Sequence, residues 1–271
     1  MNATVGKSVL HEIGNASRIR VEKEKSLTPL ASLKDRDPGR RPLDFRKIFD
    51  SKGLNIIAEV KRASPSKGDI FIEADPLKVA DEYISNGAKA ISVLTEPDYF
   101  KGDISFLKSI REAHQSFPLL MKDFFVDEYQ LYQALHSGAD AILIIMALLG
   151  EMESEKMLRG AILLGLTPLV EVHDEEELGA ALNIGASLIG INNRNLKSLE
   201  VSLNTTMDLL PKIPSGITVI SESGLETQNE LLNLRKAGCH GFLIGSSFMK
   251  SRTPGTALRR ILDIKEGSWR P

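Results

Sequence analysis

The stretch LLMKDFFVDEYQLYQALHSGADAILII, residues 119–145, contains one complete repeat of the predicted fold. An apolar run, Leu119–Met121, precedes a segment with apolar residues at helical spacing, Glu128–His136, and Asp127 stands where a helix N-cap is expected. Gly138 then ends the helix, and a second apolar run follows at Ala141–Ile145. A strand, a helix and another strand in this order are typical of a parallel sheet covered by helices.

The same unit recurs along the chain from Asn55 onward. A helix-ending glycine, a short turn and a new strand appear together in NGAKAI, SGADAI, IGASLI and AGCHGF. Apolar runs predict strands buried on both faces, and they are Ile56–Val60, Ala90–Leu94, Leu119–Met121, Ala141–Ile145, Pro168–Val172, Leu188–Ile191, Thr218–Ser221 and Gly241–Ile244. Such repetition favours a closed (β/α)8 TIM barrel over an open doubly wound sheet, which could produce much of the same pattern.

The first fifty residues have a different character from the rest. They are rich in Lys, Arg and Ser and contain the helix-breaking run Asp37-Pro38-Gly39. We expect residues 1–50 to form a helical extension over the bottom or flank of the barrel, with Arg18–Leu33 as its best helical candidate and Pro29 dividing or ending that helix. No interdomain linker is evident, so residues 51–271 are expected to form the barrel within one domain overall.

Composition limits the classes of partner. The 34 basic and 36 acidic residues leave a formal net charge of −2, which predicts neither a nucleic-acid nor an anionic-membrane surface. The single cysteine, Cys239, excludes an internal disulfide framework and a thiolate metal cluster, and the five histidines form no metal-binding pattern. We therefore expect a cytoplasmic protein with a small-molecule substrate and without a metal, and we take a monomer as the default because the sequence does not reveal the oligomeric state.

Charged side chains interrupt or end the predicted strands. They are Glu59, Lys61, Lys122, Glu171 and Glu222. A lysine or glutamate at a random position is usually a solvated surface residue, but an unpaired charge buried at a strand end would cost several kcal/mol. Because the carboxyl ends of barrel strands meet at one mouth, we expect these charges to compensate one another there.

Two further segments follow the last two predicted strands. The SESG and IGSS turns resemble the phosphate site that barrels often build at this position from backbone N–H groups, with Ser223, Gly224, Gly245 and Ser246 as candidates. By contrast, Glu175, Glu176 and Glu177 begin a predicted helix, where we expect them to serve only as capping and dipole charges.

From about Asn55 through Lys250 the chain resembles the indole-3-glycerol phosphate synthases of tryptophan biosynthesis. The resemblance rests on AEVKRASPSKG (Ala58–Gly68), ISVLTEPDYFKGD (Ile91–Asp103), MKDFFVDEYQLYQALHSGADAILII (Met121–Ile145), LVEVHDEEEL (Leu169–Leu178), GINNRNL (Gly190–Leu196), SESG and IGSS. It implies a carboxy-lyase that converts 1-(2-carboxyphenylamino)-1-deoxyribulose 5-phosphate to indole-3-glycerol phosphate, CO2 and water. It also implies that no cofactor is used.

The resemblance also implies residue roles. Lys122 corresponds to the general acid that protonates the ketone oxygen during ring closure, Glu171 to its acid/base counterpart, and Lys61 with Glu59 to a second pair; the division of steps between the pairs stays open. Lysine suits the acid role because burial or a neighbouring cation would lower its pKa. Further catalytic candidates are Asn192, Glu222 and Ser223; substrate-binding candidates are Ser64, Phe124, Arg194 and Leu196; phosphate-binding candidates are Lys61, Ser223, Gly224, Gly245 and Ser246.

Three other kinds of function compete with this interpretation. The nearest is another phosphate-binding barrel, such as a phosphoribosylanthranilate isomerase or an epimerase. The isomerase would need a cysteine base at the first strand, whereas Cys239 lies at the opposite end of the barrel and Lys61 occupies the relevant strand. A Schiff-base aldolase could use Lys122 or Lys61. A non-catalytic barrel that binds a sugar phosphate is a third possibility, because fold alone does not determine function.

Overall fold

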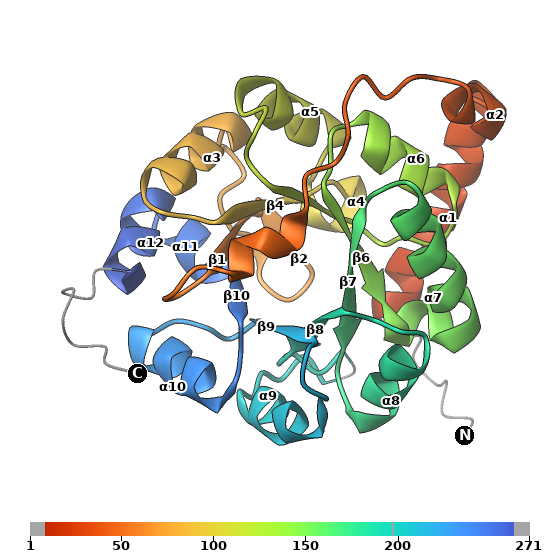
Figure 1. The fold of residues 1–271 in the computed structure, drawn as a ribbon. Helices are drawn as coiled ribbons and strands as arrows, with labels where there is room; N and C mark the ends of the chain where they lie inside the picture. Colours follow the sequence, from red (N-terminus) through yellow and green to blue (C-terminus); the bar gives the residue numbers. More distant parts are fainter. Residues whose placement is uncertain (1–8, 197, 263–271) are drawn as a thin grey trace, which may run out of the picture.

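The computed structural model describes residues 9–196 and 198–262. Within these residues eight parallel strands close a barrel in the order β1-β10-β9-β8-β7-β6-β5-β4, and β4 pairs again with β1. They are β1 (Ile56–Val60), β4 (Ala90–Leu94), β5 (Leu119–Lys122), β6 (Ala141–Ile145), β7 (Thr167–Val172), β8 (Leu188–Asn192), β9 (Thr218–Glu222) and β10 (Gly241–Ile244). The predicted closed barrel is confirmed (Figure 1), and the open sheet is wrong.

Most of the helices after β1 surround the strands on the outside, whereas the short α4 lies within the ring of helices (Figure 1). The helices after β1 are α3 (Pro76–Ser85), α4 (Pro97–Phe100), α5 (Ile104–Ala113), α6 (Tyr129–His136), α7 (Met146–Leu163), α8 (Glu175–Asn183), α9 (Asn204–Leu209), η2 (Leu210–Lys212), α10 (Gln228–Ala237), α11 (Ser246–Lys250) and α12 (Pro254–Leu262). Asp127, the predicted N-cap, accepts a hydrogen bond of 2.8 Å from the backbone N–H of Tyr129, the first residue of α6. Asp75 and Thr227 likewise accept hydrogen bonds from backbone N–H groups in the first turns of α3 and α10. Gly138 after α6 has φ of +86°, which explains why glycine stands at this recurring junction.

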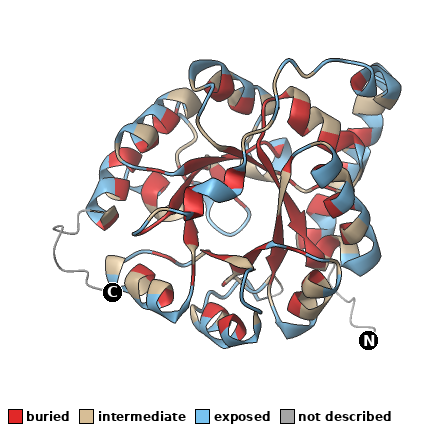
Figure 2. Cartoon of the chain, in the orientation of Figure 1, coloured by how far each residue is buried: buried red, intermediate tan, exposed pale blue. Residues whose placement is uncertain are grey.

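The strands are buried on both faces, as their apolar sequences predict. Between strands and helices lies one layer of apolar side chains, and a second layer fills the barrel interior with Ile57, Leu120, Leu143, Leu169 and Ile220. Figure 2 shows the same division, with buried residues on the strands and exposed residues on the outer faces of the helices. This packed interior leaves the mouth as the place for a functional cavity.

The N-terminal extension differs in part from its prediction. Helix α1 (Val9–Leu27) begins well before Arg18, and Pro29 separates it from α2 (Leu30–Lys34). The flank is covered as expected, because α1 packs against α6 and α7 (Figure 1), and the short helix η1 (Phe45–Phe49) contributes its aromatic side chains to the interior layer. The first turn of α1 nevertheless reaches the barrel mouth. The predicted position of the extension, over the bottom or the flank of the barrel, did not include this contact.

A small hairpin, β2 (Ala63–Ser64) and β3 (Gly68–Asp69), follows β1 and was not predicted.

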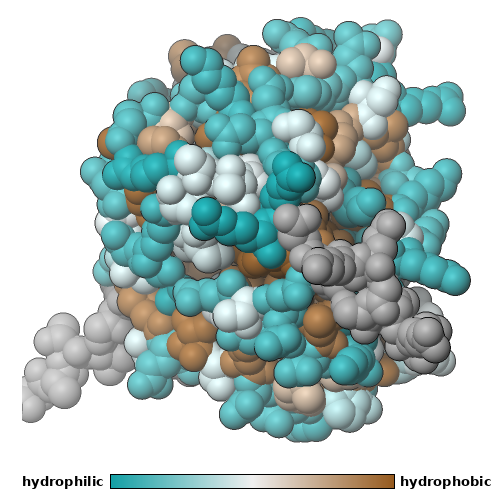
Figure 3. Space-filling model, turned by 90° about the vertical axis from the view of Figure 1, so that its left-hand side faces the viewer, coloured by the Kyte–Doolittle hydropathy of each residue, from teal (hydrophilic) through white to brown (hydrophobic). Residues whose placement is uncertain are grey.

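The face drawn in Figure 3 carries mostly hydrophilic side chains, with hydrophobic ones in small groups between them. None of the described helices combines the length and the apolar character needed to cross a bilayer.

Candidate active site

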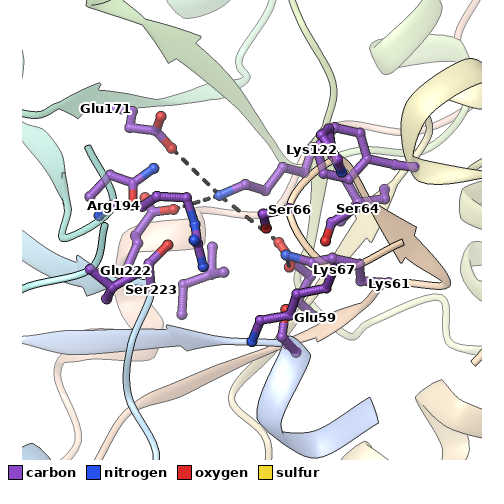
Figure 4. Close-up of a pocket in the computed structure, with 18 of the residues that line it drawn as sticks. Glu59, Lys61, Ser64, Ser66, Lys67, Lys122, Glu171, Arg194, Glu222 and Ser223 are labelled. Carbon is purple, nitrogen blue, oxygen red and sulfur yellow. Dashed lines mark hydrogen bonds and ion pairs between the residues drawn. The ribbon is translucent and has the colours of Figure 1, made fainter. Parts of the chain in front are cut away.

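A cavity of about 480 Å³ opens at the carboxyl ends of the strands. Every residue that the sequence nominated for catalysis or binding lines this cavity, and Figure 4 shows many of them facing one another across it. These residues are Glu59, Lys61, Ser64, Lys122, Phe124, Glu171, Asn192, Arg194, Leu196, Glu222, Ser223, Gly224, Gly245 and Ser246. They come from β1, β5, β7, β8, β9 and β10 and from the segments that follow these strands.

Lys122, the last residue of β5, is the centre of the charge cluster (Figure 4). Its Nζ donates a hydrogen bond of 2.5 Å to Oε2 of Glu222 and lies 3.7 Å from Oε2 of Glu171 and 3.9 Å from Oε2 of Glu59. All three carboxylates are buried, and the lysine side chain is only 15% exposed. Three strands thus direct carboxylates at one ammonium group.

The electrostatic surroundings of Lys122 correct one expectation. Burial by itself would lower the pKa of this lysine, but the charges of Glu222, Glu171 and Glu59 outweigh it and raise the pKa above its usual 10.5. The expected lowered pKa is therefore wrong, because a desolvated ammonium surrounded by carboxylates keeps its proton. Lys122 is therefore a fully charged hydrogen-bond donor within the cavity.

Glu59 forms a second pair with Lys61, two residues further along the chain. Ser92 on β4 donates a hydrogen bond of 3.5 Å to Glu59 Oε2. A Cβ on Gly245 would lie 2.5 Å from Glu59 Oε1, and a Cβ on Gly190 would collide with Oε1 of Glu222. Both glycines therefore leave room for acidic side chains, a role that the sequence did not reveal for either.

The pKa values of two glutamates beside Lys122 shift in opposite directions. Burial would raise the pKa of Glu171, but His173, Lys122 and Asn192 favour its charged form and bring the pKa down to about 2. For Glu222, burial raises the pKa to about 7 even though Lys122 opposes the shift, because the neighbouring carboxylates add to it. Glu171 is thus a carboxylate near neutrality, whereas Glu222 can hold a proton there.

Part of the cavity lining is apolar and was missed in the sequence. It includes Leu143 and Ile145 of β6, Leu243 of β10, and Leu10 and Ile13 of α1. Phe100 and Phe124 add an aromatic pair with ring centroids 5.8 Å apart. Because apolar strand residues at a barrel mouth have the same pattern as those of the core, no local signal could have separated them. These apolar side chains suit an apolar group on the ligand.

Another part of the cavity lining is positively charged. Lys67, in the hairpin after β1, lines the cavity, and its pKa is lowered by burial and by the charges of Lys250 and Arg194. Ser223 and Gly224 both have positive φ, 67° and 77°, in the segment after β9. Lys67 lies in the motif AEVKRASPSKG, but the sequence analysis did not predict it as a site residue. Its position between a proline and a glycine of that motif was the signal that could have identified it.

Cys239 lies away from the cavity. Its Sγ is 3.7 Å from the carbonyl oxygens of Val219 and Gly241, near the amino ends of β9 and β10. Burial raises the pKa of this thiol to about 12. A neutral buried thiol at this end of the barrel does not fit the cysteine base that an isomerase would need.

Among solved structures, thiamine phosphate pyrophosphorylase from Pyrococcus furiosus is similar, with a TM-score of 0.57 and 16% sequence identity over 77% of this chain and 93% of that one. At this identity the likeness shows the barrel fold alone.

Comparisons of sequence, unlike the structural likeness, identify the family. The model of the family described as indole-3-glycerol phosphate synthase matches residues 10–261. The indole-3-glycerol phosphate synthase of Acetivibrio thermocellus is 44% identical, covering 93% of this chain and 98% of its own length. That of Campylobacter jejuni is 48% identical (78% and 81% covered), and that of Salinibacter ruber is 41% identical (94% and 95% covered). The chain belongs to the indole-3-glycerol phosphate synthase family.

Proposed function

We propose that this chain is a carboxy-lyase that converts 1-(2-carboxyphenylamino)-1-deoxyribulose 5-phosphate to indole-3-glycerol phosphate, CO2 and water. One observation carries the proposal: Lys122 is held as an ammonium by carboxylates from three strands, within a cavity that is lined by apolar and by cationic side chains. The aromatic ring of the substrate suits the apolar side chains, and its phosphate and carboxylate suit the cationic groups.

Ring closure requires a proton donor. The aromatic carbon that bears the carboxylate attacks the ketone carbon, and the electron pair of the C=O bond moves to oxygen. The developing alkoxide is more basic than an amine, so Lys122 donates its proton even though its pKa is raised. The carboxylate then leaves as CO2, and the electrons of its C–C bond return to the ring.

Loss of water requires an acid and a base. The hydroxyl group leaves as water after taking one proton, and a base removes a proton from the carbon next to the ring nitrogen. We assign the base to Glu171, because its pKa of about 2 keeps it a carboxylate. We assign the acid to Lys61, which Glu59 holds at the same cavity.

The phosphate is assigned to the cationic part of the cavity lining. Backbone N–H groups of Gly224, Gly245 and Ser246 supply donors there, and Lys67 and Arg194 supply positive charge. A bound dianion would relieve the mutual repulsion that lowers the pKa of Lys67. The phosphate contributes binding that does not change during the reaction, because it is remote from the bonds that form and break.

We predict that Lys67→Ala raises KM about tenfold while kcat stays within about threefold, since it removes uniform binding. Inhibition by inorganic phosphate should weaken to the same extent. Steady-state kinetics check this, with Lys108→Ala on the exposed face of α5 as the matched control. A fall in kcat with unchanged KM would show that Lys67 acts in the chemistry instead.

Substrate labelled in its carboxylate tests the reaction. We expect one labelled CO2 for each indole product. Sodium borohydride added during turnover should leave no covalent adduct on the protein, because no Schiff base forms. Retention of the label, or an adduct on Lys122 or Lys61, would favour the aldolase.

We predict that Cys239→Ser leaves kcat and KM within about twofold, because Cys239 lies outside the cavity, and lowers the free energy of unfolding by about 1 kcal/mol, because the polar contacts of its sulfur to Val219 and Gly241 are long and weak. Kinetics and urea unfolding measure the two effects. Loss of activity in a protein that keeps its folded circular dichroism spectrum would restore the thiol-base isomerase as the better interpretation.

A further inference from the structure

His173 stands at the end of β7, two residues beyond Glu171, so alternation places both side chains on the same side of the strand. Its Nε2 lies 3.3 Å from Oε1 of Glu171, whereas Lys122 lies nearest to the other carboxylate oxygen, Oε2. Its Nδ1 lies 2.9 Å from Oε2 of Glu177, in the first turn of α8. The imidazole thus bridges a carboxylate of the cavity and a carboxylate outside it.

Hydrogen bonds hold Glu177 in position beside His173. Its backbone N–H donates to the capping carboxylate of Asp174, and its Oε2 also accepts a hydrogen bond of 2.9 Å from the backbone N–H of His173. The expectation that Glu177 acts only as a capping and dipole charge is therefore wrong. Glu175, by contrast, pairs with Lys212 on the exposed surface.

Glu171 needs a cation besides Lys122. A buried carboxylate is neutralised by desolvation unless charges or hydrogen bonds compensate it. The single ammonium of Lys122 is shared by three carboxylates and lies nearest to Glu222, at 2.5 Å. His173 is the second positive group within 4 Å of Glu171 among the described residues.

We propose that His173 is a positioning residue for this enzyme: its imidazolium, held by Glu177, keeps Glu171 ionised and aimed into the cavity. The inference rests on the proposed function of Glu171 as a base. The pKa of His173 supports it, because Glu171 and Glu177 raise that pKa to about 10 against the opposing effect of burial. The imidazole is therefore charged at the pH of turnover.

Other titratable groups share a second cavity with His173. They are His11 of α1, Glu151 of α7, Glu200 of the segment after β8 and the capping Asp174. The carboxylates that raise the pKa of the imidazole are those of Glu171 and Glu177.

Kinetics of His173→Asn test the positioning role. Removing the cation takes away an interaction that favours charged Glu171, so the pKa of Glu171 rises and the acid limb of the kcat–pH profile moves to higher pH. We expect kcat at neutral pH to fall about tenfold or more, with KM within about threefold. Glu177→Gln should act in the same direction with a smaller effect. The matched control is His114→Asn, which removes a histidine paired with Asp81 on the surface and should change neither quantity.

Nuclear magnetic resonance of the substrate-free wild-type protein tests the charge separately. We expect the ¹⁵N shifts of His173, assigned by their loss in His173→Asn, to show a doubly protonated ring up to about pH 8. In the Glu177→Gln variant the His173 ring should lose its second proton at a lower pH than in the wild-type protein. This variant also tests the inference if His173→Asn does not fold. A neutral His173 ring at pH 7, or an acid limb unmoved in both variants, would overturn the inference. Absence of turnover by the wild-type protein would instead overturn the proposed function.

Discussion

Lys122→Met should lower kcat about 100-fold or more, with a much smaller change in KM. The ammonium is the group placed to protonate the alkoxide, so its loss removes an interaction made in the transition state rather than in substrate binding. The variant is expected to fold, because Glu222, whose pKa is already about 7, can take a proton once the cation is gone. Steady-state kinetics and circular dichroism check both statements.

Lys122→Arg separates proton donation from charge. Arginine keeps the positive charge among Glu59, Glu171 and Glu222 but does not release a proton in proteins. We expect its kcat to fall nearly as far as that of Lys122→Met. Near-normal turnover by either variant would refute the assignment of Lys122 as the acid, and selective rescue by arginine would indicate a purely electrostatic role.

Asp140→Asn should lower the free energy of unfolding by about 3–5 kcal/mol, the usual cost of breaking a buried ion pair. The Asp140 carboxylate is fully buried in the turn before β6 and binds Arg111 at 2.5 Å and Arg40 at 2.6 Å. It also accepts hydrogen bonds from the backbone N–H groups of Leu43 and Leu119. A neutral amide with one acceptor oxygen cannot satisfy these donors, and both guanidinium groups lose their counter-charge.

Urea unfolding of Asp140→Asn measures this loss, with Glu153→Gln as the control. Glu153 forms an exposed pair with Lys156 on α7, and exposed pairs contribute at most about 1 kcal/mol. A loss of similar size in both variants would contradict the importance of the buried network.

Because Arg40 and Leu43 belong to the N-terminal extension, Asp140 also connects that extension to the barrel. We propose that residues 1–50 and 51–271 unfold as one cooperative unit, which predicts coincident fluorescence and circular dichroism transitions. Two separate transitions would show that the extension is an independent unit.

The barrel could be predicted from sequence because its strands are buried on both faces and therefore apolar throughout. The start of α1 could not, since Gly14 and Asn15 have low helix propensity. The structure explains the glycine: a Cβ there would lie 2.5 Å from Cδ1 of Leu148 on α7. Close packing of two helices, a tertiary effect, outweighs the local preference.

The charged half of the candidate site was predictable because each charge interrupts an apolar strand. Its electrostatics were not, since the pKa of Lys122 depends on carboxylates that three separate strands bring together. His173 could have been noticed from its spacing to Glu171, but its partner Glu177 could not be distinguished from the other acidic residues that begin α8.

Indole fluorescence during incubation of the wild-type protein with synthetic 1-(2-carboxyphenylamino)-1-deoxyribulose 5-phosphate tests the proposed chemistry most directly. We expect fluorescence to rise at a rate proportional to protein concentration, without added metal or cofactor, and to stop when the substrate is consumed. Folded wild-type protein that leaves the substrate unchanged would contradict the proposal.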